Sequence, residues 1–395
     1  MNDEIFLKYY SDNVEKELEN IDFSSEYISH AKDKFYPVKL KIFNLKSPAA
    51  NIFKQTCLSL GFDSAVARDI ITCKCEKSDV ILTATISQLH KLSEKLKLQP
   101  FGLKNLAEKL DNFLNFPSDY KISDKSFDFK KSYIMGILNV TPDSFSDGGK
   151  NFDCDTAVNS ALKMLDDGAD IIDIGGESTR PDATPVSPIE EIERVIPVIK
   201  KIKSANPSAI ISIDTMHPET AVAAINAGAD ILNNVGDVEL FKSVYPFLSG
   251  HGVPVVITHS VSVPPQPVDK DYEGDIVDYL CKFFVEKINY LKNNGLTDNL
   301  FILDVGIGFG KSVNDQFEII KRAEEFIPLG YPVLFGISRK SFLSKTFGQD
   351  NRDDATVVFD QYLMQKGVNI LRVHDVSAHQ KVRNYLSNGL PVSIS

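Results

Sequence analysis

Polar and ionisable side chains recur at the ends of short apolar runs in the C-terminal two thirds of this 395-residue chain. Each run contains mostly Ile, Val and Leu, and each ends at or just before a residue that could do chemistry. Carboxylates and amides recognise the edge of a heterocycle or bind Mg²⁺, whereas Lys and Arg bind phosphate or carboxylate groups. In chain order these residues are Asn139, Asp173 with Glu177, Asp214, Asn233, His259, Asp304, Ser338-Arg339-Lys340, and Arg372 with His374.

The apolar runs have the composition of strands in a parallel sheet. Strands covered on both faces appear as continuous runs of Ile, Val and Leu without polar alternation. Amphipathic stretches with helical spacing, such as residues 155–167 and 188–203, separate the runs. Eight strand–helix units in about 260 residues match the size of a (β/α)8 TIM barrel, so the sequence predicts an α/β protein with that fold. The runs are residues 134–140, 171–175, 210–214, 231–235, 254–259, 301–305, 332–337 and 370–373.

The predicted barrel would bring these side chains to one rim. The carboxyl ends of all eight strands meet there, and active sites of this fold lie at that end. A single polar residue at a strand end is equally well explained by a turn or a helix cap. Eight such positions on one rim favour a binding site. Arg180, Lys311, Lys340 and Arg372 add basic groups to this rim, which predicts an anionic substrate group such as phosphate or carboxylate.

Composition changes near residue 130. Only Gly61 and Gly102 of the 22 glycines precede that point, and residues 1–130 contain 19 basic and 19 acidic side chains, so the remainder carries the whole net charge of −11. Such a change indicates two structural units. We predict a small α+β domain of unknown role in residues 1–130, with strands near residues 36–45 and 79–85, and the barrel in residues 131–395. The polar stretch 119–131 is the predicted connection.

Composition also excludes several classes of protein. A net charge of −11 argues against a general nucleic-acid or anionic-membrane surface. No apolar run approaches the roughly 18 residues of a membrane span. Five scattered cysteines do not form a disulfide framework, so we expect a reduced, cytoplasmic protein without nucleic-acid or membrane partners.

Five loop motifs occur in a fixed order after the predicted strands. They are Asn139-Val-Thr-Pro-Asp-Ser-Phe-Ser-Asp-Gly-Gly149, Gly175-Gly-Glu-Ser-Thr-Arg-Pro181, Asp304-Val-Gly-Ile-Gly-Phe-Gly-Lys311, Ser338-Arg-Lys-Ser341 and Arg372-Val-His-Asp375. In this order the chain resembles dihydropteroate synthase of folate biosynthesis, from about residue 134 to residue 386. The first loop is close to diagnostic, whereas the glycine-rich segment alone would be weak. Residues 1–130 show no matching signature, and we expect them to take no part in the chemistry.

The resemblance implies a transferase that joins 6-hydroxymethyl-7,8-dihydropterin pyrophosphate to 4-aminobenzoate, giving 7,8-dihydropteroate and pyrophosphate, with Mg²⁺ and by a dissociative mechanism. The implied catalytic residues are Asp214, Asp304, Lys340 and Arg372. The implied pterin site comprises Asp214, Asn233, Asp304, Phe309 and Lys340. Asn139, Arg372 and His374 are implied to bind pyrophosphate, and Asn139 is also the implied metal ligand. The implied aminobenzoate site and its loops comprise Phe145, Asp147, Thr179, Arg180, Pro181 and Ser341. A homodimer is expected by analogy.

The chain departs from the family pattern at three places. Val305 stands where the family often has Pro, Asn234 where it often has Asp, and Ser260-Val261-Ser262 where it has Met-Gln-Gly. The third change affects the expected pterin wall and leaves His259 equally open to a site role or a structural role. Two other functions therefore remain as alternatives: a pterin-dependent methyltransferase and a non-catalytic pterin-binding paralogue.

Overall fold

The chain divides between Phe116 and Pro117 into two units, each with its own hydrophobic core. The structure is a computed structural model that describes residues 14–72, 74–116, 118–141, 154–177, 186–236, 238–261, 272, 274–297 and 299–389. Within these residues, no helix combines the length and apolar character needed to cross a membrane.

The N-terminal unit is a small α+β fold, as predicted. Its antiparallel sheet has the order β1-β3-β2, formed by β1 (Pro37–Lys46), β2 (Ser64–Val66) and β3 (Lys77–Thr85). Buried and exposed residues alternate along β3, so one face of the sheet meets the apolar sides of the helices. The helices of this unit are α1 (Val14–Asn20), α2 (Ser25–Ala31), α3 (Ser47–Ser59), α4 (Ile86–Leu96) and α5 (Leu103–Leu114).

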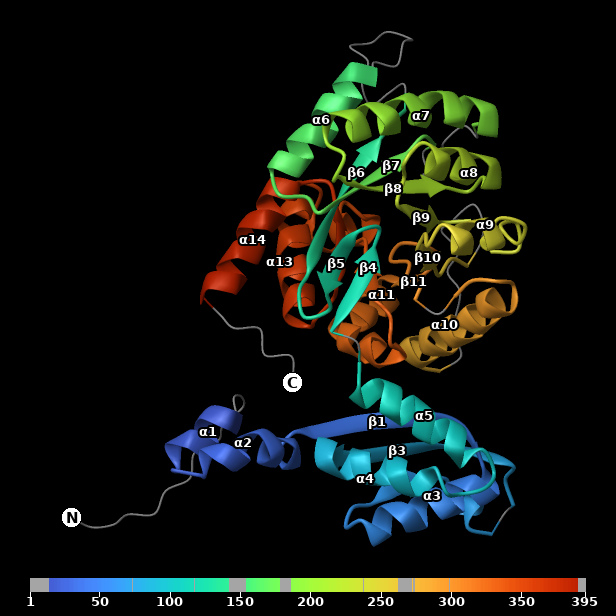
Figure 1. Ribbon diagram of the computed structural model, residues 1–395, viewed down its shortest axis with the longest axis vertical. Helices are drawn as coiled ribbons and strands as arrows, with labels where there is room; N and C mark the ends of the chain where they lie inside the picture. The colour runs from blue at the N-terminus through green and yellow to red at the C-terminus, as the bar shows by residue number, and fades with distance from the viewer. Residues whose placement is uncertain are drawn as a thin grey trace, which may run out of the picture. The chain divides into compact units, whose positions relative to one another are not determined.

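The C-terminal unit is a closed barrel of eight parallel strands, which confirms the predicted fold (Figure 1). The strands are β6 (Tyr133–Asn139), β7 (Ile171–Gly175), β8 (Ile210–Thr215), β9 (Ile231–Asn234), β10 (Val255–Thr258), β11 (Phe301–Asp304), β12 (Val333–Phe335) and β13 (Ile370–Val373). The surrounding helices are α6 (Cys154–Asp166), α7 (Pro188–Ala205), α8 (Pro218–Asn226), α9 (Tyr245–Gly250), α10 (Ile276–Asn293), α11 (Val313–Lys321), α12 (Ser341–Phe347), α13 (Arg352–Gln365) and α14 (Val376–Gly389).

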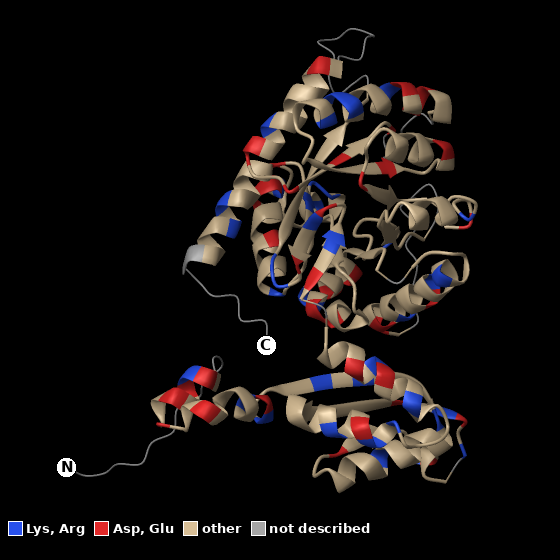
Figure 2. Ribbon diagram, viewed as in Figure 1, with Lys and Arg blue, Asp and Glu red and all other residues tan. Residues whose placement is uncertain are grey.

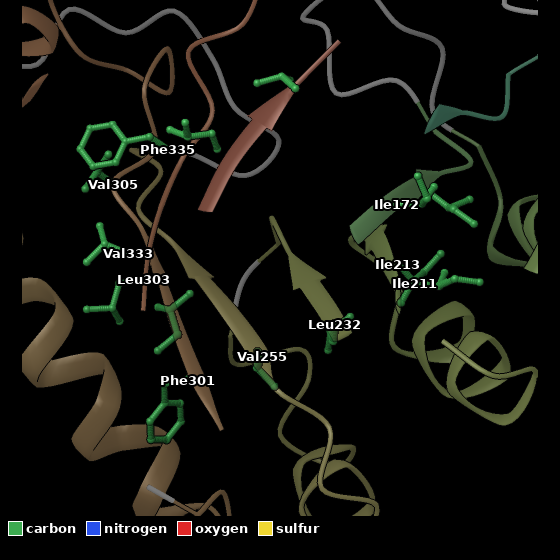
Figure 3. Close-up of a cluster of buried hydrophobic side chains, with 14 of the residues drawn as sticks. Ile172, Ile211, Ile213, Leu232, Val255, Phe301, Leu303, Val305, Val333 and Phe335 are labelled. Atoms are coloured by element: carbon green, nitrogen blue, oxygen red, sulfur yellow. The ribbon is translucent and has the colours of Figure 1, made fainter. Parts of the chain in front are cut away.

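Side chains on the two faces of the barrel strands belong to different hydrophobic clusters. One set, including Ile172, Ile213, Leu303 and Phe335, faces outward and packs in a cluster with apolar residues of the surrounding helices (Figure 3). The alternate set faces inward and provides one apolar residue from every strand. These eight are Met135, Ile171, Ile210, Ile231, Val256, Ile302, Leu334 and Ile370. We call them the floor of the barrel.

A short hairpin before the first barrel strand packs on this floor. It consists of β4 (Asp119–Ile122) and β5 (Lys125–Asp128), and its Tyr120, Ile122 and Phe127 are buried in the same cluster as the floor residues. The division between the units therefore lies about 14 residues before the predicted boundary at residue 130. The stretch predicted as a connection is part of the barrel unit because its alternate residues are apolar and bury one face of the hairpin.

Two positions beyond the floor, the inward residues change from apolar to polar on six strands. Because side chains alternate along a strand, residues two apart point to the same side. These inward positions are Asp173, Ser212, Asn233, Thr258, Asp304 and Arg372. Charged residues are otherwise concentrated on the helices, and most of the strand ribbon of the barrel is uncharged (Figure 2). The charged groups in the lumen are therefore the exceptions that need an explanation.

We expect Phe127→Ala to destabilise the barrel by about 3 kcal/mol, because it removes a buried ring from the hairpin and leaves a cavity over the floor. Lys125→Ala, at an exposed position of the same strand, is the matched control and should change stability by less than about 0.5 kcal/mol. Denaturant unfolding of the full chain measures both. Equal stability of the two variants would contradict the assignment of the hairpin to the barrel unit.

Candidate active site

Arg372 faces the lumen and joins three strands, because its side chain reaches from β13 to residues of β7 and β8. Its Nε donates to Asp173 Oδ2 at 2.6 Å, and its Nη2 donates to Asp214 Oδ2 at 2.6 Å. Asn233 Nδ2 donates to the same Asp173 oxygen at 3.1 Å. The Asp173 side chain is fully buried, and that of Asp214 is 10% exposed. Planar guanidinium groups suit two carboxylates in this way, and buried charges are tolerated only when they are paired.

Burial affects the pKa of the carboxylate Asp214 and that of the guanidinium of Arg372 in different ways. Burial raises the pKa of Asp214 to about 7, with a smaller upward contribution from Asp173, while Arg372 and Lys340 oppose the shift. Burial also opposes the charge of Arg372, but the two carboxylates more than offset it and raise the pKa of Arg372. Arg372 therefore stays protonated, whereas Asp214 gains or loses its proton near neutral pH.

Asp304 ends β11 and holds the turn that follows it. Its Oδ1 accepts a hydrogen bond from the backbone N–H of Gly306 at 2.8 Å. Gly306 has a φ of +66°, and a Cβ there would lie 1.8 Å from the carbonyl oxygen of His259, so only glycine fits. The second carboxylate oxygen of Asp304 lies 3.5 Å from Thr258 Oγ1. Burial raises the pKa of Asp304, whereas the Gly306 hydrogen bond and the charge of Lys340 lower it.

Lys340 and Phe309 come together from two different loops. Lys340 precedes α12, and its Nζ lies 4.2 Å from the centre of the Phe309 ring, within the range of a cation–π contact. Burial lowers the pKa of Lys340 to about 8, and the charge of Arg372 acts in the same direction. The structure thus places two of the residues predicted for the pterin site in direct contact.

His374 follows β13 and is held by Ser338, which follows β12. Ser338 Oγ accepts the backbone N–H of His374 at 3.2 Å and lies 2.9 Å from its Nδ1. A hydroxyl that accepts the backbone N–H can donate its own proton to Nδ1, and in that tautomer the imidazole proton is on Nε2. Burial, with the charges of Arg339 and Arg372, lowers the pKa of His374 to about 4. At neutral pH His374 is therefore a neutral hydrogen-bond donor and not a cation.

Lys311 does not belong with the basic groups that the sequence predicted for anion binding. Its Nζ donates to the carbonyl oxygen of Gly306 at 2.8 Å and lies 2.8 Å from His259 Nδ1. It is buried, and burial lowers its pKa to about 7. The side chain ties the glycine-rich loop to the end of β10. His259 is likewise buried, against the rings of Tyr279 and Phe283, which supports its structural role.

The remaining predicted residues fall into two groups. Asn139 ends β6 and is exposed, and Ser341 is exposed in the first turn of α12. A Cβ at Gly175 would lie 3.9 Å from Asn139 Oδ1 and 3.7 Å from Asp214 Cβ, so this glycine leaves open the space between those side chains. The residues predicted for the aminobenzoate loops, namely Phe145, Asp147, Thr179, Arg180 and Pro181, lie outside the described residues.

Asp173 is the main group to which the sequence assigned no role. Its position at the end of an apolar run was noticed, but only the fold shows that it faces Arg372, which is 199 residues away. The structure also accounts for two of the three departures from the family pattern, those at Asn234 and Val305. Asn234 Oδ1 accepts the N–H of Gly236 at 2.8 Å, a bond that Asp would also make. Val305 is fully buried in the outward-facing cluster, away from the lumen.

The closed barrel with this polar lumen belongs to the class of pterin binding enzymes. A family model with the description pterin binding enzyme matches residues 135–374. The chain is 42% identical to dihydropteroate synthase of Streptococcus pyogenes over 64% of its own length and 94% of that protein. Dihydropteroate synthase of Xanthomonas albilineans, solved with 4-aminobenzoic acid, superposes with a TM-score of 0.62 at 35% identity over 68% of this chain and 97% of that one. The chain belongs to the dihydropteroate synthase family.

The N-terminal unit also has a counterpart among the relatives. A probable bifunctional folylpolyglutamate synthase/dihydropteroate synthase of Haloferax volcanii is 37% identical over 83% of this chain. That share exceeds the barrel unit alone, so the similarity extends into the N-terminal unit. The chain spans 40% of the length of that relative.

We expect Arg372→Ala to cost about 3–5 kcal/mol of stability, because it leaves two buried carboxylates without their cation. Adding Asp173→Asn should recover part of that loss, since it removes one of the uncompensated charges. Denaturant unfolding of the two single variants and the double variant gives the coupling between the residues. Strictly additive losses would show that the pair does not interact.

Lys340 should make stability depend on pH. Because burial lowers its pKa from 10.5 to about 8, the unfolded chain binds a proton between these values that the folded chain does not. The free energy of unfolding contributed by this group therefore rises with pH across that window. Lys340→Met should lose this rise, and Lys345→Met, at an exposed position of the helix that follows Lys340, should keep it. Unfolding curves from about pH 7 to pH 11 test this; a slope equal to the parent's in Lys340→Met would contradict it.

Proposed function

We propose that this chain condenses 6-hydroxymethyl-7,8-dihydropterin pyrophosphate with 4-aminobenzoate to 7,8-dihydropteroate and pyrophosphate. One observation supports the proposal. In this chain, Asp214, Asp304 and Arg372 lie close to one another inside the barrel, and Lys340 lies near them against the ring of Phe309. These groups supply hydrogen-bond acceptors for a heterocycle and positive charge for a leaving anion. The X. albilineans relative was solved with one of the two proposed substrates.

The proposed pterin site uses carboxylate and amide oxygens that face the lumen above the floor of the barrel. The amide and amino edge of a pterin offers N–H donors, and the oxygens of Asp214 and Asp304 accept them. Asp214 Oδ1 and Asn233 Oδ1 are buried without a hydrogen-bond partner in the described part of the chain, so unused acceptors are available. Phe309 offers a ring face to the heterocycle, and Lys340 donates to its carbonyl and ring nitrogen.

The proposed pyrophosphate site lies at the ends of β13 and β6. Arg372 supplies positive charge, and neutral His374 donates from Nε2. Asn139 is exposed at the end of β6, and the hard oxygen of its amide suits Mg²⁺. Bound there, Mg²⁺ would neutralise charge on the departing pyrophosphate, and Asn139 would be its protein ligand.

The proposed mechanism is dissociative and needs no nucleophilic side chain. Departure of pyrophosphate, which takes the electron pair of the C–O bond, leaves a resonance-stabilised pterin cation. The neutral amine of aminobenzoate then forms a C–N bond to the exocyclic carbon and loses one proton to water or to the released pyrophosphate. What the residues supply is stabilisation of separated charge, which is usually the largest catalytic contribution. In this scheme Asp214 and Asp304 stabilise the cation while Arg372 and His374 hold the anion. Ser341 and the loop residues Phe145, Asp147, Thr179, Arg180 and Pro181 are proposed to shape the aminobenzoate site.

Two further proposals concern the oligomeric state and the N-terminal unit. The chain is expected to form a homodimer, which light scattering of the purified protein tests. The N-terminal unit is expected to take no part in the chemistry, because every proposed site residue lies in the barrel unit. A chain starting at Ser118, which keeps the hairpin, should retain turnover. A folded barrel without activity would contradict this.

The decisive experiment for the reaction combines the purified full chain with Mg²⁺, pterin pyrophosphate and labelled aminobenzoate, and measures dihydropteroate. We expect product from the parent chain. Pterin binding without turnover would instead identify a non-catalytic paralogue, and methyl transfer from a methylated pterin would identify the methyltransferase alternative.

Asp304→Asn tests the pterin site directly. The substitution keeps the shape but replaces one acceptor with a donor that faces the pterin N–H, so affinity should fall by about 2–4 kcal/mol. Asp350→Asn, at an exposed position, is the control and should bind as the parent does. Titration of a pterin ligand measures both variants. Because Asp304 also holds the Gly306 turn, a loss of thermal stability with affinity within about threefold of the parent would refute the site assignment.

A further inference from the structure

Three side chains meet outside the ring of strands, between β7, β8 and α7. Asp214 faces the lumen, so the next residue of β8, Thr215, faces the surrounding helices. Its Oγ1 donates to Glu191 Oε2, on α7, at 2.7 Å. Glu177 follows β7, and His217 precedes α8. None of these three ionisable residues, Glu177, Glu191 and His217, has a part in the proposed reaction.

The three side chains point their ligand atoms at one another. His217 Nδ1 lies 3.0 Å from Glu191 Oε2 and 4.0 Å from Glu177 Oε2. One nitrogen and two carboxylate oxygens thus lie within 4.8 Å of one another. The side chain of Glu191 is fully buried, and those of Glu177 and His217 are 9% and 25% exposed. One edge of the cluster therefore remains open to small ions through His217.

Glu177 Oε2 and Glu191 Oε1 have no hydrogen-bond partner in the described part of the chain. Arg194, the cation nearest along α7, donates to the carbonyl oxygen of Gly176 and to Glu190 instead. Leaving buried carboxylate oxygens without partners costs free energy, and a cation bound between the two side chains would offset that cost.

The surroundings already orient each ligand. Thr215 Oγ1 accepts the backbone N–H of His217 at 3.0 Å while donating to Glu191, so one hydroxyl positions two of the three side chains. The backbone N–H of Val186 donates to the other oxygen of Glu177 at 3.1 Å. Such outer hydrogen bonds are the usual means by which a protein fixes the ligands of a metal.

We propose that Glu177, Glu191 and His217 bind one divalent transition-metal ion, with Zn²⁺ as the expected occupant. An imidazole nitrogen with two carboxylates suits Zn²⁺, whereas Mg²⁺ and Ca²⁺ prefer oxygen ligands alone. Water would complete the four ligands. The ion would tie the end of β7 to α7 and to the start of α8. This site is separate from the Mg²⁺ proposed at Asn139 and does not depend on the proposed reaction.

Metal binding by the full chain, without substrates, tests the proposal. The protein is stripped with a chelator, returned to chelator-free buffer and titrated with Co²⁺, whose visible absorption reports nitrogen and oxygen ligands; Zn²⁺ then displaces it. His217→Ala and Glu191→Gln remove ligands. Glu190→Gln, at the preceding and exposed position of α7, and Asn139→Ala are the controls.

We expect one equivalent of Co²⁺ to bind, Zn²⁺ to displace it, and excess Mg²⁺ to leave it in place. Both ligand variants should weaken binding about tenfold or more, and both controls should bind as the parent does. The melting temperature should rise with Zn²⁺ in the parent and in both controls, but not in the ligand variants. If Glu191→Gln fails to fold, His217→Ala decides, because His217 is partly exposed. Absence of saturable binding, or unchanged affinity in His217→Ala, would overturn the proposal.

Discussion

The guanidinium of Arg372 between two buried carboxylates is the interaction on which the candidate site depends. A barrel closed at one end by an apolar floor offers little water to solvate charge, so Asp173 and Asp214 persist there only because a cation bridges them. The same bridge fixes where Arg372 points. Burial raises the pKa of Asp214 to about 7 although the charge of Arg372 opposes the shift, so a bound ligand that donates to Asp214 or adds positive charge would favour its ionised form.

The layered lumen explains why the site has its depth. The floor residues of all eight strands pack in one buried cluster with the hairpin, and polar residues begin two positions later along six of the strands. The inward-facing side chain of Asp304 accepts the N–H of Gly306, and this turn positions the ring of Phe309, which Lys340 contacts. Packing below thus determines the geometry of recognition above.

Much of this arrangement could be predicted from the sequence, for identifiable reasons. Continuous apolar runs marked all eight strands, and polar residues at their ends marked Asp214, Asp304, Lys340 and Arg372. The sequence could not predict that the side chain of Lys311 binds backbone carbonyl groups inside the protein and not a substrate, because carbonyl groups have no sequence signature. The cluster of Glu177, Glu191 and His217 was likewise invisible, since its members come from three elements. The alternation of Tyr120, Ile122 and Phe127 was a readable strand signal within a stretch that looked polar overall.

The seam between the first and last strands has a consequence for synthesis of the chain. Asn369 Nδ2, just before β13, donates to the carbonyl oxygen of Phe129 at 2.8 Å across 240 residues, and Ser132 Oγ donates to the carbonyl oxygen of Val368. Such long-range closure is slow because it orders the whole intervening chain. During synthesis the hairpin is the first part of the barrel unit to leave the ribosome, and β13, which carries Arg372, is the last barrel strand to follow. Until β13 is released, the barrel cannot close between its first and last strands, and Asp173 and Asp214 lack their cation. Closure of the barrel and pairing of the buried carboxylates therefore occur in the same late step.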